Sequence, residues 1–166
     1  KGSRTQLESA VSLAYDTYGT VVDSDSKLVW KRYKSTQASI DGVVPVINGN
    51  SLTNSIQMLC NYLGGDVNAL SHMNGGMDAV DIISSINGVN GINLTGITYD
   101  KILSYIGEGS QVIARIGDNQ YIVIIAYNSN EIAYIDGETG VQKTITMNDA
   151  GKMFSEGGNV YVTYYK

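Results

Sequence analysis

The chain has 166 residues, enough for one domain with its own core, and 43% of them are hydrophobic while only 16% are charged. Eleven basic and sixteen acidic residues give a net charge of −5. An acidic chain without a basic block argues against nucleic-acid and anionic-membrane partners. No apolar run approaches the roughly 20 residues that a membrane span needs, so we expect no membrane insertion.

The chain contains one cysteine, Cys60, and one histidine, His72. They can form neither an internal disulfide nor a zinc site of cysteine and histidine ligands. No metal and no cofactor is therefore expected. A chain that begins at Lys1 and is rich in Asn, Gly, Ser, Thr and Tyr is typical of a domain from a larger secreted or cell-surface protein.

Helices are predicted in the first two thirds of the chain. Thr5 and Glu8 form a capping box, and apolar residues then recur at helical spacing as far as Gly19. Further helices, each followed by glycine or Asn-Gly, are expected at about 51–63, 77–86 and 99–106. Two short strands are expected at 20–22 and 28–31, and the stretch 33–50 is read as irregular.

The last third has the period of β-strands. Short β-branched and aromatic runs separated by turn residues predict strands at 111–116, 120–127, 131–135, 141–147 and 160–165, with a short helix at 148–154. Helices followed by a hairpin-rich antiparallel sheet predict a single α+β domain.

Three local pieces within this order carry a resemblance to a known family. Asn61-Tyr62-Leu63-Gly64 ends a helix, Gln120 to Tyr127 forms a strand, and Ile135-Asp136-Gly137 ends the next strand. From about residue 43 the chain resembles the bacterial double-glycine-leader peptidases, a branch of the papain-like cysteine peptidases. The resemblance implies a papain-like α+β fold, a helical layer packed on an antiparallel sheet. It also implies a core at 43–166 preceded by a helix and β-ribbon extension at 1–42.

The resemblance also assigns three catalytic positions. In that family the helix opens with a catalytic Cys-Gly, the strand opens with the catalytic His, and the next strand ends in Asp-Pro. Residue by residue, these positions fall on Ser51, Gln120 and Asp136. The family's upstream glutamine has no equivalent near residues 45–48. Residues 22–25 and 30–32 resemble a segment that precedes such domains in long surface proteins of Gram-positive anaerobes.

The substitutions at these positions predict the loss of peptidase catalysis. A serine hydroxyl is a weak nucleophile without an adjacent base. The amide of Gln120 has no nitrogen that accepts a proton near neutral pH, so it cannot act as that base. General-base assistance is worth roughly 10²–10⁴-fold, and the members of a triad act as a unit. Asp136 alone restores nothing.

An active enzyme that uses Cys60 or Ser51 is the alternative hypothesis. Cys60 follows Ile56 by four residues on the apolar face of its helix and lies in the last turn, where the helix dipole disfavours a thiolate. We therefore expect a buried, structural cysteine. His72 lies in a loop before the sheet and is interpreted as a solvated or backbone-capping residue.

Other features have structural interpretations. Asp23, Asp25 and Asp41 could be calcium ligands, but the first two lack the glycine and terminal glutamate of an EF-hand loop and are read as a turn. The glycines at 88–91 and 107–109 are read as turns rather than as phosphate loops. Trp30 is expected on a half-buried strand, and the tyrosines Tyr161, Tyr164 and Tyr165 are expected at the edge of the sheet.

Three function hypotheses follow. The first is a non-catalytic peptidase-like module that binds a peptide or glycan in the cleft around Ser51, Gln120 and Asp136, or serves as a spacer. The second is an active cysteine peptidase or acyltransferase that uses Cys60 or Ser51. The third is an assembly or adhesion domain that pairs through its terminal strand. The sequence predicts no oligomeric state.

Overall fold

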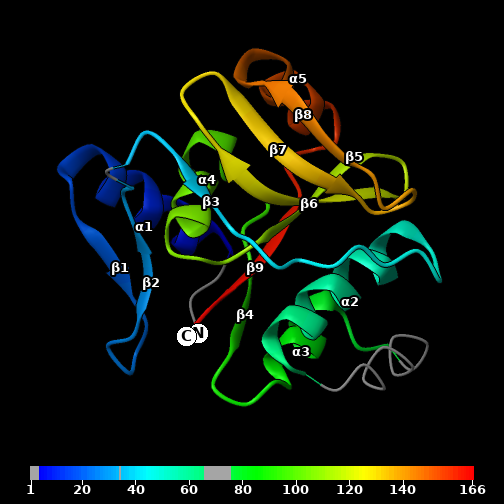
Figure 1. Ribbon diagram of the computed structural model, residues 1–166. Coiled ribbons are helices and arrows are strands. Elements are labelled where there is room, and N and C mark those ends of the chain that lie inside the picture. The colour runs from blue at the N-terminus through cyan, green and yellow to red at the C-terminus, as the bar shows by residue number, and fades with distance from the viewer. Residues whose placement is uncertain (1–3, 34, 66–75) are drawn as a thin grey trace.

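The computed structural model describes residues 4–33, 35–65 and 76–166 (Figure 1). The helices are α1 (Arg4–Thr17), α2 (Ser51–Leu63), α3 (Ala79–Ser84), α4 (Tyr99–Gly107) and α5 (Met147–Glu156). The strands are β1 (Thr20–Val22), β2 (Leu28–Lys31), β3 (Ala38–Ser39), β4 (Asn90–Asn93), β5 (Val112–Gly117), β6 (Gln120–Tyr127), β7 (Glu131–Asp136), β8 (Gln142–Thr146) and β9 (Tyr161–Tyr165). Helices and an antiparallel sheet in one unit confirm the predicted α+β class.

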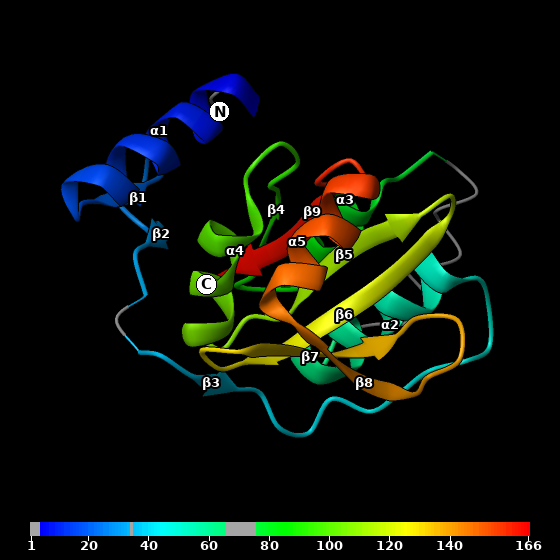
Figure 2. The same cartoon turned by 90° about the horizontal axis from the view of Figure 1, so that it is seen from above.

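One sheet dominates the structure, with the strand order β4-β9-β5-β6-β7-β8. All of its strand pairs are antiparallel, and the short β3 pairs with the end of β6. Strands β1 and β2 form a separate antiparallel ribbon. Figure 2 shows this ribbon and α1 standing to one side of the main sheet.

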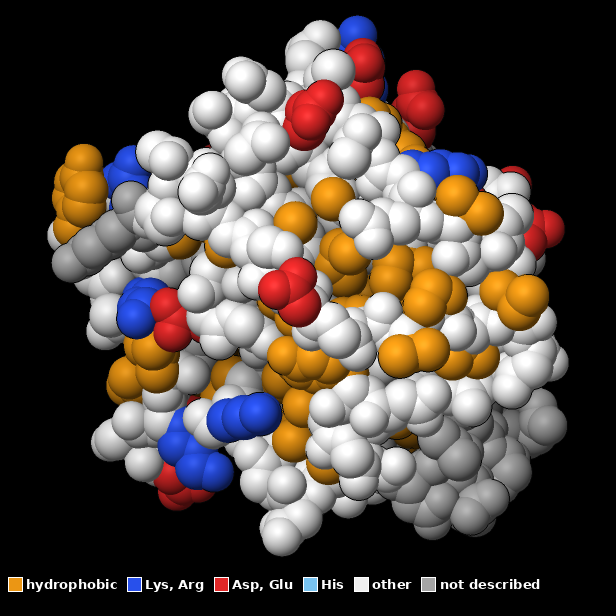
Figure 3. Space-filling model, viewed as in Figure 1, with side chains coloured by type: hydrophobic (Ala, Val, Ile, Leu, Met, Phe, Trp, Pro, Cys, Tyr) orange, Lys and Arg blue, Asp and Glu red, His pale blue; other side chains and the backbone are white. Residues whose placement is uncertain are grey.

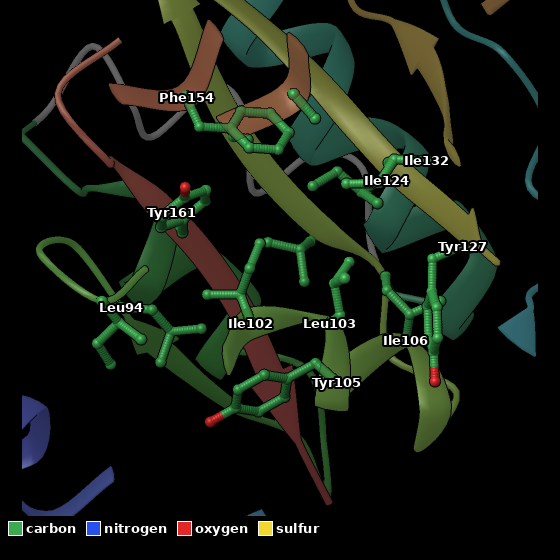
Figure 4. Close-up of a cluster of buried hydrophobic side chains, with 14 of the residues drawn as sticks. Leu94, Ile102, Leu103, Tyr105, Ile106, Ile124, Tyr127, Ile132, Phe154 and Tyr161 are labelled. Carbon is green, nitrogen blue, oxygen red and sulfur yellow. The ribbon is translucent and has the colours of Figure 1, made fainter. Parts of the chain in front are cut away.

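The sheet separates two hydrophobic cores because successive side chains of a strand point to opposite faces. On β6, Ile122 and Ile124 face the core formed with α4 and α5, whereas Val123 and Ile125 face the core formed with α2 and α3. Figure 4 shows the first core, in which Phe154 of α5 and Tyr161 of β9 pack over the α4 residues Ile102 and Leu103.

The N-terminal elements share the first core rather than forming one of their own. Val11 and Ala14 of α1 and Trp30 of β2 are buried in the same cluster as α4. The Trp30 indole Nε1 donates a hydrogen bond of 2.9 Å to the carbonyl oxygen of Lys101. Trp30 is therefore more deeply buried than expected, with 3% of its surface exposed. The division into an extension at 1–42 and a core at 43–166 stays a prediction.

The expectation of a turn at residues 88–91 is wrong in its second half. Gly88 has a left-handed φ of 77°, as a turn requires, but Asn90 and Gly91 begin β4. A Cβ atom at Gly91 would lie 2.5 Å from the carbonyl oxygen of Val80 in α3. The glycine therefore allows the strand to pass close to the helix, because it has no side chain to hold the neighbouring backbone away.

The expectation that the C-terminal tyrosines edge the sheet is also wrong. Strand β9 lies between β4 and β5, and Tyr161 and Tyr164 are buried. Because β9 pairs with a strand on each side, it is not the free edge through which a second chain could add. No helix in the described ranges is long and apolar enough to span a membrane.

Candidate functional site

The start of α2 is fixed by its own cap and by the sheet beneath it. The side chain of Asn50 accepts a hydrogen bond of 2.9 Å from the backbone N–H of Thr53, as an N-cap residue does. The helix ends as predicted at Leu63, followed by Gly64 with a left-handed φ of 71°. Its apolar face, including Ile56 and Leu59, packs in the second core. Ser51, the first helical residue, therefore lies at the beginning of β6.

The hydroxyl of Ser51 is bound to the backbone of β6. It donates to the carbonyl oxygen of Tyr121 at 2.9 Å and accepts from the N–H of the same residue at 2.6 Å. Only 6% of the Ser51 surface is exposed. Its one proton is donated to a backbone carbonyl and one of its lone pairs accepts from a backbone N–H, so the hydroxyl is engaged by the backbone rather than by a base.

Asn54 of α2 and Gly137 in the turn after β7 also connect the helix to that turn. The amide nitrogen of Asn54 donates to the carbonyl oxygens of Gly137 at 2.8 Å and Gly49 at 2.9 Å, and its amide oxygen accepts from the N–H of Gly49 at 2.8 Å. The N–H of Gly137 donates to the Tyr121 carbonyl oxygen at 3.0 Å. Asn54 is fully buried, and its hydrogen bonds offset the cost of burying an amide.

The spacing of polar residues in α2 indicates this cluster, although the resemblance to the peptidase family made no use of it. Ser51, Asn54 and Ser55 are polar residues at i, i+3 and i+4, so they lie on one face of α2. All three are buried, and the Ser55 hydroxyl donates to the Ser51 carbonyl oxygen at 2.8 Å. Polar residues on the buried face of an otherwise apolar helix indicate that this face makes hydrogen bonds to the backbone of another segment.

Asp136 is held by the turn that follows β7. Its carboxylate accepts from the backbone N–H groups of Glu138 and Thr139 at 2.9 and 3.1 Å, and from the Lys143 ammonium at 2.9 Å. Burial by itself raises the pKa of Asp136, but the bond from Lys143 and the two backbone donors outweigh it and lower the pKa below its ordinary value. The carboxylate is ionised and already paired.

Gln120 is exposed at the end of the β5–β6 hairpin, where it pairs with Gly117. Its side chain lies on the same face of β6 as Ile122, and Asp136 lies opposite Ile122 on β7. The structure thus brings Ser51 against the backbone beside Gln120 and Asp136. No hydrogen bond joins these three side chains in the described ranges, because Gln120 and Asp136 point to the face away from α2.

Cys60 is buried as predicted, with 1% of its surface exposed. Burial raises the pKa of its thiol to about 11, so almost no thiolate forms at neutral pH. His72 lies outside the described residues. Within them, no group of three or more His, Cys, Asp or Glu side chains comes together as a metal site. Asp23 serves the turn after β1, because its carboxylate accepts from the N–H groups of Asp25 and Lys27.

No protein-family model and no curated protein matches the sequence. A search of solved structures matches a protein from Bacillus anthracis, described as a candidate C39-like peptidase, with a TM-score of 0.66. The match covers 80% of this chain and 98% of that one, at 11% sequence identity.

The chain has a C39-peptidase-like fold. At 11% identity the likeness speaks for the fold and not for catalysis, which depends on particular side chains. It confirms the peptidase-like scaffold expected from the order of segments. The assignment of Ser51, Gln120 and Asp136 to triad positions and the relationship to leader peptidases stay predictions.

Proposed function

We propose that this chain is a non-catalytic module with a C39-peptidase-like fold, part of a larger secreted or cell-surface bacterial protein, in which it binds a peptide or glycan or acts as a spacer. The observation that carries this proposal is the hydroxyl of Ser51, which is bound to both backbone groups of Tyr121 at the expected nucleophile position. A residue whose hydroxyl is used to dock a helix onto a strand supports structure and not bond cleavage.

The chemistry around Ser51 supports the proposal. A hydrolase of this type needs a base within hydrogen-bond reach of the nucleophile and a third group that orients the base. Gln120 has no basic nitrogen, and Asp136 is ionised but paired with Lys143. Losing the general base removes roughly 10²–10⁴-fold of rate even where the other parts are in place.

The test is a direct search for hydrolysis. The full chain is incubated with serine- and cysteine-directed active-site probes and with peptide libraries that include double-glycine leader sequences. We expect neither labelling nor cleavage, and Ser51→Ala should give the same result as the unaltered chain in both assays. Cleavage that disappears in Ser51→Ala would show that the chain is an enzyme. Circular dichroism of both proteins establishes that a negative result comes from folded chains.

The alternative enzyme hypothesis needs Cys60 or Ser51 as a nucleophile. The thiol of Cys60 is buried in the second core and lies in the last turn of α2, where the helix dipole opposes a thiolate. Rapid alkylation of Cys60 at neutral pH with simultaneous loss of a measured activity would favour this hypothesis over the first.

A patch of exposed hydrophobic residues favours an assembly or adhesion role as a second candidate function. Val44, Ile47 and Val141 have 65%, 66% and 52% of their surfaces exposed, and Ile47 lies against the turn at Gly140. Figure 3 shows hydrophobic side chains gathered near the centre of this face, where the segment between β3 and α2 crosses the sheet. Light scattering of the unaltered chain and of Ile47→Lys tests whether the patch joins two molecules.

A further inference from the structure

Three asparagine-glycine pairs lie among the described residues, at 48–49, 87–88 and 90–91. Such a pair can modify itself. The backbone nitrogen of the glycine attacks the side-chain amide carbon of the asparagine, so that a C–N bond forms, ammonia leaves and a succinimide ring closes. Water then opens one of the two ring carbonyls and leaves aspartate or isoaspartate. Glycine favours the attack because it has no Cβ atom to obstruct the approach, and asparagine is one of the thermolabile residues.

The local sequence of the three pairs is similar. Each asparagine follows a β-branched residue, namely Ile47, Ile86 or Val89. The side chain before the reacting group is therefore matched in bulk and stiffness. Differences in rate between the three pairs of the folded chain should consequently come from the structure around each glycine nitrogen.

Two of the three glycine nitrogens are held by hydrogen bonds. The N–H of Gly49 donates to the side-chain oxygen of the buried Asn54 at 2.8 Å, and the N–H of Gly91 donates to the hydroxyl of Ser84 at 2.9 Å. The attacking nitrogen has to give up its proton and turn toward the asparagine side chain, so it must first leave this bond. A hydrogen bond of ordinary net strength should slow the reaction about fivefold.

The nitrogen of Gly88 is not held in this way. Its N–H makes no hydrogen bond in the part of the chain that the structure describes. Asn87 and Gly88 are exposed in the turn between α3 and β4, where the N–H of Val89 donates to the carbonyl oxygen of Ile86 at 3.1 Å. Figure 1 shows this turn at the lower edge of the molecule. Apart from its chain neighbours, no atom would lie within 4 Å of a Cβ atom at Gly88, which leaves room for the reaction.

We infer that Asn87 is a site of self-modification, converted to aspartate or isoaspartate before Asn48 and Asn90. This inference goes beyond the proposed function and does not depend on it. Either product adds a negative charge to the turn. Isoaspartate also routes the backbone through the former side chain, which inserts one extra carbon atom shortly before β4. Because β4 is held by its pairing with β9, with Asn90 opposite Tyr165, the modification acts on the segment that positions this edge strand.

The inference is tested by ageing the full chain at neutral pH and raised temperature. Peptide mapping by mass spectrometry follows each pair separately, including 74–75, which lies outside the described residues, and isoaspartyl methyltransferase labels the isoaspartate. We expect Asn87 to react first, with Asn48 and Asn90 about fivefold or more slower. In urea, which removes the hydrogen bonds, the three rates should become similar. Asn87→Gln should abolish the modification at this position, because glutamine would have to close a larger ring.

Ser84→Ala tests whether the hydrogen bond protects the neighbouring pair. Removing this exposed hydroxyl frees the N–H of Gly91, so the rate at Asn90 should rise about fivefold while the rate at Asn87 stays the same. The matched control is Ser85→Ala, whose hydroxyl donates to the carbonyl oxygen of Ile82 at 2.6 Å instead. It should leave the rate at Asn90 unchanged. Circular dichroism establishes that both variants are folded.

Three results would overturn the inference. The first is conversion of Asn48 or Asn90 in the folded chain as fast as that of Asn87. The second is an Asn87 that stays intact in the folded chain over a period in which the chain in urea converts it. The third is an Asn90 rate that Ser84→Ala does not change, because the hydrogen bond would then not decide which pair reacts. None of these results bears on whether the chain cleaves peptides.

Discussion

Ser51 and Tyr121 are 70 positions apart in the chain, yet one hydroxyl joins them through two hydrogen bonds, one donated and one accepted. The pair ties the first residue of α2 to the second residue of β6. Because both hydrogen bonds are made with backbone groups of one residue, the contribution of this hydroxyl is one of stability.

Removing the hydroxyl should therefore cost stability. In Ser51→Ala the N–H of Tyr121 loses its acceptor at a partly buried position, whereas the Tyr121 carbonyl keeps its bond from Gly137. An unpaired buried donor costs about 1–3 kcal/mol. For a chain of this size we expect the melting temperature to fall by about 2–4 °C for each kcal/mol.

The control for Ser51→Ala is Ser155→Ala, on the exposed face of α5. That substitution should change the free energy of unfolding by less than about 0.5 kcal/mol. Equal melting temperatures for the two variants, measured by differential scanning calorimetry, would contradict a structural role for the Ser51–Tyr121 contact.

The paired Asp136 should make stability fall in acid. Its pKa is lowered in the folded chain, so the stabilisation is fully present above the ordinary aspartate pKa of about 3.9 and is lost as pH falls through the folded value. Lys143→Gln removes a partner that holds the pKa down, so the pKa of Asp136 should rise toward its ordinary value.

Carboxyl-detected NMR titration of Asp136 and urea midpoints at pH 7 and pH 3 measure this effect. The loss of midpoint between the two pH values should be smaller in Lys143→Gln than in the unaltered chain. Lys152→Gln is the control, because the Lys152–Asp149 pair is long, at 3.9 Å, and exposed. If Asp136 titrates at the same pH in Lys143→Gln and in the unaltered chain, the ion pair does not lower the pKa of Asp136.

Local signals explain why much of the fold could be predicted. Helix α2 runs over the predicted residues because both of its ends are marked, by the cap at Asn50 and by Gly64. The hairpin strands β6 and β7 were predicted from short runs of β-branched and aromatic residues bounded by turn residues. These features depend on neighbours within a few positions, so the sequence displays them directly.

Strand β4 and the position of β9 depend on distant partners and were not predicted. Asn90–Asn93 has the composition of a turn and becomes a strand only because β9 pairs with it. Because β9 lies between β4 and β5, Tyr164 is buried, although the sequence predicted it at the edge of the sheet. In the candidate site, the roles of Asn54 and Gly137 appear only when residues 83 positions apart meet.

The burial of Cys60 predicts a slow thiol. Raising the thiol pKa from 9.0 to about 11 lowers the thiolate fraction at neutral pH by about 100-fold, and burial restricts access further. Alkylation by iodoacetamide at pH 7.5 should be at least that much slower for the folded chain than for free cysteine. Unfolding in guanidinium should restore the ordinary rate, and mass spectrometry measures both. A folded chain alkylated as fast as free cysteine would place the sulfur at the surface.

Gly137 is the position where a single methyl group should separate α2 from the sheet. A Cβ atom there would lie 2.5 Å from the Tyr121 carbonyl oxygen, 2.6 Å from the Ser55 hydroxyl and 2.7 Å from the Ser51 carbonyl oxygen. Two of these atoms belong to backbone already fixed by hydrogen bonds, so the strain cannot be relieved by turning a side chain. Overpacking of this kind costs about 1–3 kcal/mol.

The matched substitution is Gly107→Ala at the end of α4, where the nearest atom to an added Cβ is the Tyr127 hydroxyl at an ordinary 3.5 Å. Chemical denaturation should show Gly137→Ala less stable than the unaltered chain, with Gly107→Ala unchanged or slightly more stable because alanine favours helix. In Gly137→Ala the amide resonances of residues 49–55 and Tyr121 should shift together, because one contact holds them. A Gly137→Ala protein as stable as Gly107→Ala would mean that α2 and β6 are not packed as closely as the Ser51 hydrogen bonds require.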